Sequence, residues 1–367
     1  MASMSRPLQI HQYHPTLSSG DAISSQLQWI RATLNRSGIH SEIVTAKGFE
    51  VQQEQLKQSD LILIHHSQFN PHLNELMQFS APKALVYHNI TPSKFYHHDA
   101  VVFSECQRGR KQLRTLMGKT IANFVDSHYN GEELEHLGFE NISRLPLVNL
   151  QGRAIPSRNR PPKSPKRIIF VGRIAPHKNQ LLLIQALWNL QSWFPGGYHL
   201  SLVGSGDPIY LSYLEDWIAA LGLENQIDVL GKVTDSSLES LYASSHAYVS
   251  CSLHEGFGIP LVEAMCHGLP VFALSKTAVR ETLGNAGVQF ETEDPAQLAQ
   301  LLRAGLNDSS LLDRIVEGQN QRIKQLQREH SAALILQKLT SLVETEPNDE
   351  RKRKAQEHTH PLQRDLS

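Results

Sequence analysis

Short apolar runs alternate with amphipathic, helix-like stretches along most of this chain, and that alternation limits the fold more than any other feature. In the first half, strand-like runs occupy residues 8–12, 42–45, 61–64, 84–87, 121–125 and 142–145, and helix-like stretches occupy 21–35, 71–79, 105–117 and 131–137. Strands that alternate with helices are typical of parallel sheets with crossover helices. We therefore predict an α/β protein.

The segment 151–166 interrupts this alternation, because it is rich in arginine, proline, serine and lysine, as linkers between domains often are. After it, strand-like runs occupy 167–171, 200–203, 227–230, 247–249 and 271–273, and helix-like stretches occupy 179–194, 209–221, 236–244, 260–267, 295–306, 311–329 and 332–345. Ser236 and Glu239 have the spacing of a capping box, which predicts a helix start at Ser236.

The length of 367 residues suits two domains of roughly 100–200 residues each. We predict a first Rossmann-like domain at 1–150, a linker at 151–166, a second Rossmann-like domain at 167–330 and a C-terminal helix at 331–345. The tail 346–367 is charged and poor in large apolar residues, which predicts disorder.

Composition and charge narrow the classes of function and the compartment. The formal net charge is −1, so no global electrostatic field favours binding to nucleic acid. The three cysteines, Cys106, Cys251 and Cys266, show neither a paired framework nor a metal-binding spacing. We find no apolar core of a signal peptide, and no apolar stretch approaches the roughly 20 residues that span a bilayer. We therefore expect a cytoplasmic protein that is soluble or peripheral to a membrane.

Glu255 and Glu263 narrow the function more than any other pair of residues. Glu255 follows a strand-like run, and Glu263 lies one turn inside a helix that is expected to open at Pro260. Gly256 and Gly258 leave the intervening backbone open to a ligand. Strand, glycine loop and helix N-terminus together bind phosphate, because the first N–H groups of the helix lack partners. Carboxylates accept from paired hydroxyls, so a nucleotide sugar fits; the alternative is a loop that only packs, with both glutamates solvated.

This run resembles the donor-site motif of retaining, nucleotide-sugar-dependent glycosyltransferases of family 4, in which seven residues separate two glutamates and Gly-Phe-Gly follows the first. The resemblance implies the GT-B fold, with an acceptor-side and a donor-side Rossmann-like domain facing each other across a cleft. It implies that Glu263 accepts from the ribose hydroxyls and that Glu255 holds sugar hydroxyls. Sugar and phosphate are then bound by the N–H groups of Gly256, Phe257, Gly258 and Ile259.

Gly172, Arg173 and Lys178 follow the first strand of the second domain. Two cations beside a helix N-terminus suit a diphosphate, because the guanidinium can pair with two oxygens and the ammonium acts as a point charge. The resemblance implies that Arg173 and Lys178 hold the donor diphosphate and stabilise it as it leaves. His177 stands where many relatives carry an acidic residue. The alternative is a solvated basic loop.

Two further glycine turns follow strands of the second domain, at Gly204 and at Gly231. The resemblance places Gly204 beside the nucleotide, and Gly231, Lys232 and Val233 near the base. A Gly-x-Gly sequence is often only a turn, so the residues alone leave both readings open.

In the first domain, Gly20 and His88 are the candidate site residues. Gly20 at a helix start lets the backbone reach across the cleft towards a phosphate or the acceptor, although many relatives have two glycines there. Asp21 beside it is either part of this loop or only a helix N-cap. His88 resembles the family's histidine that faces the donor sugar and phosphate; the alternative is a histidine that only caps a strand end.

The chain contains 19 histidines, several of them adjacent. We expect His65 and His66 at the edge of the cleft, on the acceptor side, and we assign no role to His97 and His98. No histidine pair has the helical spacing and third ligand of a zinc site. With Arg173 and Lys178 as the cations, we expect no metal and no cofactor besides the nucleotide-sugar donor substrate.

The basic stretch 107–119 allows a membrane contact. Three cations would face anionic lipid beside three apolar residues, namely Arg108, Lys111 and Lys119 with Leu113, Leu116 and Met117. Because many similar enzymes use lipid-linked acceptors, a peripheral position at the inner face of the plasma membrane is one expectation. The alternative is a docked surface helix whose basic face is solvated.

The resemblance therefore implies retaining transfer of a hexosyl group from a nucleoside-diphosphate sugar to a glycan or lipid-linked acceptor. The short first domain and the run from Tyr87 to Pro92 are similar to bacterial enzymes that build surface polysaccharides, often mannosyltransferases. GDP-mannose is thus the first expected donor and a UDP-sugar the second. The alternatives are a non-catalytic nucleotide-sugar-binding scaffold and a GT-B epimerase or phosphorylase.

Overall fold

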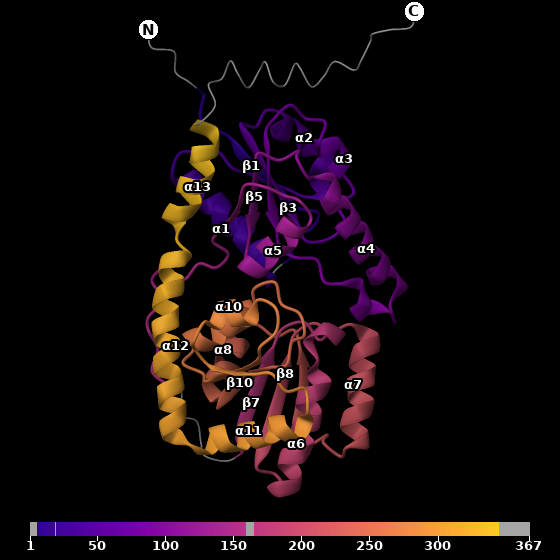
Figure 1. Ribbon diagram of the computed structural model, residues 1–367, viewed down its shortest axis with the longest axis vertical. Helices are drawn as coiled ribbons and strands as arrows, with labels where there is room; N and C mark the ends of the chain where they lie inside the picture. Colours follow the sequence, from indigo (N-terminus) through magenta and orange to yellow (C-terminus); the bar gives the residue numbers. More distant parts are fainter. Residues whose placement is uncertain (1–5, 19, 159–164, 345–367) are drawn as a thin grey trace, which may run out of the picture.

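The computed structural model describes residues 6–18, 20–158 and 165–344 of the 367-residue chain. Within these residues the chain forms two six-stranded sheets, both entirely parallel, one from each half of the chain. The two halves are stacked along the long axis of the molecule (Figure 1). The α/β prediction is therefore confirmed.

The first sheet has the strand order β2-β1-β3-β4-β5-β6. Its strands are β1 (Ile10–Tyr13), β2 (Ile43–Val44), β3 (Leu61–His66), β4 (Lys83–Tyr87), β5 (Ala122–Val125) and β6 (Ile142–Arg144). Between them lie α1 (Ala22–Arg36), α2 (Phe49–Lys57), α3 (Leu73–Leu76), α4 (Ala100–Thr115) and α5 (His128–His136), with two short 3-10 helices, η1 (Ala46–Gly48) and η2 (Ser93–Tyr96). The central strands β3 and β4 are buried along their whole length, because helices cover both of their faces.

The second sheet has the order β12-β11-β10-β7-β8-β9. Its strands are β7 (Lys166–Val171), β8 (Tyr198–Val203), β9 (Ile227–Gly231), β10 (Ala247–Ser250), β11 (Val271–Leu274) and β12 (Val288–Phe290). The helices are α6 (Gln180–Trp193), α7 (Pro208–Ala220), α8 (Asp235–Ser244), α9 (Ile259–Cys266), α10 (Val279–Leu283), α11 (Pro295–Asn307) and α12 (Ser309–Glu329), with the 3-10 helix η3 (Pro176–Lys178).

The last described helix, α13 (Ala332–Glu344), returns to the first half of the molecule. Its apolar side chains, among them Ile335 and Leu339, join the buried cluster of Ile30 and Leu34 on α1. Figure 1 shows α12 running beside the second half and α13 continuing to α1. Between α12 and α13, the Nδ1 atom of His330 accepts a hydrogen bond from the Leu147 N–H at 3.0 Å. The C-terminal helix therefore packs as part of the first half.

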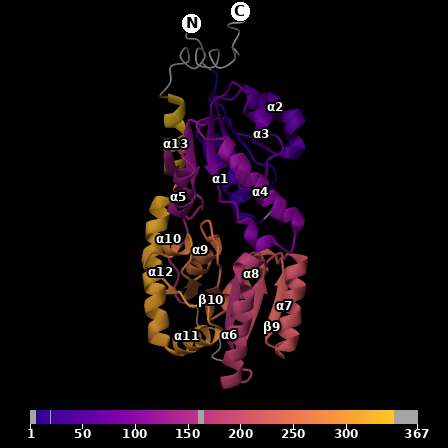
Figure 2. The ribbon, with the colours of Figure 1, turned by 45° about the vertical axis from the view of Figure 1, so that its right-hand side comes forward.

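The carboxyl ends of the two sheets face each other. The Ser127 hydroxyl, just after β5, donates to the Gly256 carbonyl, beyond the end of β10, at 2.7 Å. Asn89, just after β4, is 2.7 Å from His254. Figure 2 shows the two halves in contact from a second direction, with α5 above α10. Ligands of open parallel sheets bind outside the carboxyl ends of the strands, so this junction is where a site is expected.

Two helix starts differ in how they match the sequence. Asp21 caps α1, because its carboxylate accepts from the Ser24 N–H at 3.0 Å, so the N-cap reading is confirmed. The capping box predicted at Ser236 is wrong: Thr234 caps α8 and accepts from the Ser237 N–H. Thr234 has the extended backbone that an N-cap requires, which moves the helix start towards the N-terminus.

Three elements lack a strong sequence signal and were not expected. The helix α2 buries only Phe49 and Leu56, so it has no apolar stripe to recognise. The strand β12 and the helix α10 are short. Conversely, the helix predicted at 71–79 is reduced to Leu73–Leu76. The tail 346–367 lies outside the described residues, so its predicted disorder stays a prediction.

Candidate functional site

The candidate site lies at the carboxyl ends of β7 and β10, where the strand order of the second sheet reverses. Strand β7 pairs with β8 on one side and with β10 on the other, so the chain leaves these neighbouring strands in opposite directions. A crevice forms at such a point. The segment 172–178 leaves β7 and the segment 251–259 leaves β10, so the fold brings together the two strongest sequence motifs.

Glycines shape the exits of β7 and β8. Gly172 has φ +148° and Gly204 has φ +142°, values that favour glycine. A Cβ atom on Gly204 would lie 1.9 Å from the Gly172 carbonyl oxygen, so no side chain fits there. Gly204 is therefore required by backbone packing; its contact with a nucleotide stays a prediction.

Lys178 and Glu255 form an ion pair between the two exits. The Nζ atom of Lys178 lies 2.6 Å from Oε1 of Glu255, and their side chains are only 15% and 13% exposed. The backbone around each is fixed: the Glu255 N–H donates to the Thr277 hydroxyl at 2.9 Å, and the Arg173 carbonyl accepts from Gln180 at 3.0 Å. The Arg173 side chain is exposed and hydrogen-bonds the Tyr96 hydroxyl of the first half, an interaction that opposes the rise in the Tyr96 pKa caused by burial.

Glu263 lies one turn inside α9, as predicted. The Tyr242 hydroxyl donates to its Oε2 atom at 3.4 Å. Burial raises the pKa of the Glu263 carboxyl above its ordinary value, while Arg153 and the hydrogen bond from Tyr242 oppose the rise. Gly258, with φ +90°, caps α9, so the helix begins with Ile259 and its free N–H groups follow the loop directly.

The side chain of Phe257 belongs to the hydrophobic core of the second half. It is 6% exposed and packs edge-on against the ring of His330, with centroids 5.3 Å apart. Its carbonyl accepts a hydrogen bond from the Thr282 hydroxyl. The side chain and carbonyl of Phe257 are therefore engaged within the protein, and only its backbone N–H can bind sugar or phosphate.

Gly20 and Lys232 face each other across the junction. A Cβ atom on Gly20 would lie 3.7 Å from Cε and 3.8 Å from Nζ of Lys232. Gly231, with φ +64°, accepts from the Gly204 N–H at 2.8 Å, which ties the β8 and β9 exits together. Val233, next along the chain, packs against the core of the second half. The loop after β1 therefore meets the β9 exit, as the predicted cleft requires.

The ring of His88 lies inside the first half, with its side chain 1% exposed. Its Nδ1 atom is 2.9 Å from Oδ2 of Asp126, and its Nε2 atom is 2.8 Å from Nδ1 of His65. His65 continues this buried chain to Gln12 at 3.1 Å. Both ring nitrogens of His88 are thus engaged within the protein. Contact with a donor sugar stays a prediction, and it requires the ring to exchange one of these partners.

The predicted position of His65 and His66 at the cleft edge is wrong. Both are buried within β3, and His66 hydrogen-bonds the Gly109 carbonyl at 2.9 Å. Burial lowers the pKa of both rings below the ordinary histidine value, so both rings are neutral. His97 packs against Phe103, whereas His98 reaches Asp207 of the second half at 3.3 Å.

The basic stretch 107–119 forms the end of α4, and its apolar side turns inward. Leu113 and Leu116 are fully buried in the core of the first half, while Met117 is exposed. The guanidinium of Arg108 lies over the ring of Phe69, 3.5 Å from its centroid. This is the arrangement of a docked surface helix. None of the helices in the described ranges is long and apolar enough to cross a membrane.

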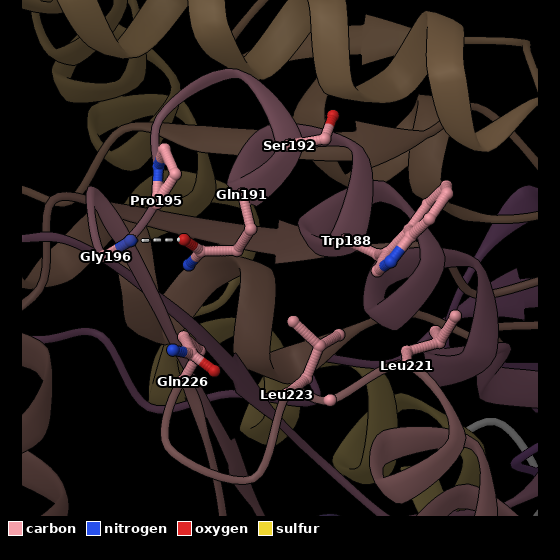
Figure 3. A pocket seen from close by; sticks show the side chains of 9 residues that line it. Trp188, Gln191, Ser192, Pro195, Gly196, Leu221, Leu223 and Gln226 are labelled. Atoms are coloured by element: carbon pink, nitrogen blue, oxygen red, sulfur yellow. Dashed lines mark hydrogen bonds between the residues drawn. The ribbon is translucent and has the colours of Figure 1, made fainter.

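Two other features lie away from the strand exits. Among the described residues, Glu50, His72 and Glu75 could hold a metal ion, since they offer ligand atoms within 4.8 Å of one another. They belong to α2, α3 and their flanks, at the far end of the first half (Figure 1). A cavity of about 270 Å³, lined by Trp188, Gln226 and their neighbours, opens at the amino ends of β8 and β9 (Figure 3). Neither feature borders Lys178 or Glu255.

The second half of the chain matches the family of glycosyl transferases group 1 over residues 153–322. This stretch is similar in sequence to group 1 glycosyl transferases. The motifs around Arg173, Glu255 and Glu263 all fall within it. The family match therefore covers the segments that follow β7 and β10.

Curated relatives resemble the same region. The chain is 32% identical over 146 residues to the O-antigen chain mannosyltransferase B of Escherichia coli, covering 39% of this chain and 37% of that one. It is 32% identical over 189 residues to the phosphatidyl-myo-inositol mannosyltransferase of Mycobacterium leprae, covering 50% and 49%. The chain thus matches less than half of the length of these relatives.

Solved structures show how far the fold extends. The chain resembles Anabaena Alr3699/HepE in complex with UDP and glucose, with a TM-score of 0.68, 18% identity, and coverage of 92% of this chain and 100% of that one. It resembles WaaG, a glycosyltransferase involved in lipopolysaccharide biosynthesis, with a TM-score of 0.69, 15% identity, and coverage of 92% and 100%. The likeness spans both halves of this chain, so the predicted GT-B fold is confirmed.

Proposed function

We propose that this protein is a retaining glycosyltransferase of family 4. It moves a hexosyl group from a nucleoside-diphosphate sugar to a glycan or lipid-linked acceptor, in the synthesis of a polysaccharide or glycoconjugate. The observation that supports this most is the ion pair of Lys178 with Glu255. It lies between the ends of β7 and β10, in the sheet whose sequence matches the group 1 glycosyl transferases. A cation and a carboxylate held together there can bind the two ends of one reacting bond, the diphosphate and the sugar.

Charge on the departing diphosphate is what such a site has to stabilise. Arg173 and Lys178 follow β7 and are the cations that would accept this charge. The N-terminus of α9 adds the N–H groups after Gly258, which has the left-handed backbone that opens the helix. Glu255 then accepts from sugar hydroxyls. These groups are fixed before the ligand arrives, so they lose little freedom when charge develops.

Glu263 is the proposed ribose ligand. A carboxylate accepts hydrogen bonds from two neighbouring hydroxyls, and Tyr242 holds one of its oxygens in place. Gly204, Gly231, Lys232 and Val233 border the space on the β8 and β9 side, where the base would lie. Gly20 and His88 belong to the first half and would contact phosphate and sugar from across the junction.

Retention of configuration follows from reaction on one face of the sugar, with the leaving phosphate assisting deprotonation of the acceptor. Arg173 and Lys178 supply positive charge, so we propose that the transfer needs no metal ion. An assay in the presence of EDTA measures this directly. The anomeric configuration of the first product, read by NMR, tests retention.

The donor is proposed from the relatives. Mannosyltransferases among them favour GDP-mannose, and the structural likeness to a protein in complex with UDP and glucose makes a UDP-sugar the second choice. A ligand that binds only the folded protein raises the unfolding temperature, and at equal concentrations the tighter ligand raises it more, so a thermal-shift panel of GDP, UDP and ADP identifies the base.

The decisive experiment is Glu263→Ala. Turnover of the best nucleotide sugar should be lost while the circular dichroism spectrum is unchanged. Glu239→Ala, at an exposed glutamate of α8, is the matched control and should keep wild-type turnover. Wild-type turnover by Glu263→Ala would refute the site, and binding without turnover by the wild type would favour the non-catalytic scaffold.

We retain a membrane contact by residues 107–119 in this proposal, but only an electrostatic one. Lys111, Arg114 and Lys119 are exposed and can face anionic lipid, whereas the apolar side of the helix is packed inside. Such contact would be electrostatic and lost at high salt. Sedimentation with vesicles that contain anionic lipid, at low and high salt, measures it.

A further inference from the structure

His254 projects from the second half of the molecule into the first. It directly precedes Glu255 and is 6% exposed. Its Nε2 atom lies 2.7 Å from Oδ1 of Asn89, and its ring is bordered by those of Phe95 and Tyr129, with centroids 6.3 and 6.0 Å away. An amide oxygen can only accept, so Nε2 carries the proton and donates. The ring is therefore a neutral donor held by residues of the first half.

The side chain of Asn89 is oriented by other residues of the first half. It has φ +67°, a left-handed conformation that asparagine tolerates better than most residues. Its amide nitrogen donates to Asn130 at 3.0 Å and to Glu133 at 3.3 Å, which fixes the direction of the oxygen towards His254. Glu133 in turn accepts from the Tyr87 hydroxyl at 2.7 Å. The acceptor for His254 is thus set before the two halves meet.

The residue after Glu255 is held from the same side. The Ser127 hydroxyl donates to the Gly256 carbonyl at 2.7 Å. A Cβ atom on Gly256 would lie 3.1 Å from Cβ of Asn89 and 3.2 Å from the His88 carbonyl oxygen. Residues of the first half therefore contact both neighbours of Glu255 in the chain, His254 and Gly256.

We propose that His254 and Asn89 are positioning residues that set the donor loop, residues 255–259, when the two halves close on each other. This inference rests on the proposed function, because it concerns the same site. If the halves separate, the hydrogen bond and the ring contacts are lost together, and Glu255 is one peptide bond away. Contact with the first half then completes the donor site, as hinge closure does in other two-domain proteins.

Closure is expected to depend on pH. The groups that face His254 are Lys178 on η3, Arg110 on α4, Lys94 on η2, and the neutral Tyr129 and His177. Burial, helped by the three cations, lowers the pKa of His254 to about 3. Exposed in separated halves, the ring regains an ordinary pKa of about 6.5. Acid therefore favours separation, and the stability of the closed state falls as the pH drops below about 6.5.

Three variants test the proposal. Asn89→Gly removes the acceptor without straining the backbone, His254→Ala removes the donor, and His254→Gln keeps an N–H donor but cannot titrate. At pH 7.5, Asn89→Gly and His254→Ala should raise KM for the nucleotide sugar about tenfold, the loss expected for one buried hydrogen bond, with a smaller change in kcat. His254→Gln should restore KM at that pH. His136→Gln, an exposed residue that bonds only within α5, is the matched control.

The pH profile separates positioning from simple packing. As the pH falls from 7.5 to 5.5, donor affinity of the wild type should fall, and His254→Gln should reduce the slope by up to about one log unit per pH unit. His177, which hydrogen-bonds Tyr96 of the first half, would also take up a proton when the halves separate. The pH profile of His254→Gln is therefore expected to keep some slope. Equal slopes in wild type and His254→Gln would overturn the proposal.

Small-angle X-ray scattering supplies a readout that does not need turnover. We expect a larger radius of gyration for His254→Ala and Asn89→Gly than for the wild type at pH 7.5. A wild type that binds no nucleoside diphosphate refutes the proposed function but leaves this comparison intact. Identical scattering of all the proteins, at pH 7.5 and at 5.5, refutes the role of His254 and Asn89 in closure.

Discussion

The Nζ atom of Lys178 lies 2.6 Å from Oε1 of Glu255, and this ion pair joins the exits of β7 and β10. Both side chains are mostly buried, so removal of either partner leaves a charge without compensation. The pair also fixes the two groups relative to each other before any ligand binds.

Lys178→Met should lower kcat by roughly 100-fold to 1000-fold, the loss typical when one preorganised electrostatic group is removed from a transition state. Lys178→Arg keeps the charge and should lose less. Because Lys178 and Glu255 touch, the effects of Lys178→Met and Glu255→Gln should not add in the double variant. Steady-state kinetics of the four proteins measure the coupling; strictly additive effects would mean that the two residues act separately.

Gly204→Ala should lower the free energy of unfolding by about 3 kcal/mol, because overpacking and a strained backbone each cost about 1–3 kcal/mol. The added Cβ would meet the Gly172 carbonyl at 1.9 Å. Urea denaturation measures the change. Gly318→Ala, in α12 with nothing within 4 Å of the new Cβ, is the control and should stabilise the protein. Equal stability of Gly204→Ala and wild type would contradict the close approach of the two strand exits.

Leu339→Ala should destabilise the protein by about 2–5 kcal/mol, the usual cost of a cavity at a buried leucine. Leu339 is fully buried in the cluster that α13 forms with α1. Gln337→Ala, at an exposed position of the same helix, should change little. A thermal or urea unfolding series shows whether the C-terminal helix supports the first half, and indifference to Leu339→Ala would show that it does not.

His330→Asn should make the protein less sensitive to acid. Burial lowers the pKa of His330 to about 4, while its Nδ1 atom accepts from the Leu147 N–H. Neutral His330 therefore stabilises the fold above about pH 6.5, and this contribution is lost as the pH falls towards 4. Asparagine can accept the same hydrogen bond without titrating.

As the pH falls from 6.5 to 4, the unfolding free energy of the wild type should decrease faster than that of His330→Asn, by up to about 1.4 kcal/mol per pH unit. Urea denaturation at several pH values gives the two slopes. His199→Asn, at a partly exposed position 2.7 Å from Asp228, serves as the comparison. Parallel pH dependences of wild type and His330→Asn would show that His330 does not take up the proton.

Motifs confined to a few consecutive residues could be predicted from the sequence. The exit of β7 and the run from Glu255 to Glu263 each contain their strand end, glycines and charged groups within a short segment. Their relation also follows from the parallel βα pattern, because parallel strands carry their loops at one edge of the sheet. The ion pair of Lys178 with Glu255 agrees with the prediction that both residues belong to one site.

Positions that depend on strand pairing could not be placed in this way. His65 and His66 look like residues after a strand, but β3 continues through them because His66 pairs with Tyr87 of β4. Their side chains are then buried in the sheet. Likewise, the apolar residues of 107–119 resemble a membrane-facing surface, yet Leu113 and Leu116 fill the core of the first half.

The sequence by itself determined the α/β class, the glycine loops and the carboxylate and cation pairs of the candidate site, because each depends on neighbours along the chain. Only the tertiary structure decided that α13 returns to the first half, that His88 is held by Asp126 and His65, and that His254 reaches Asn89. The last two residues are 165 positions apart, and no local pattern encodes their meeting. The contact between His254 and Asn89 forms only when the two sheets pack together, which depends on the shape of both surfaces.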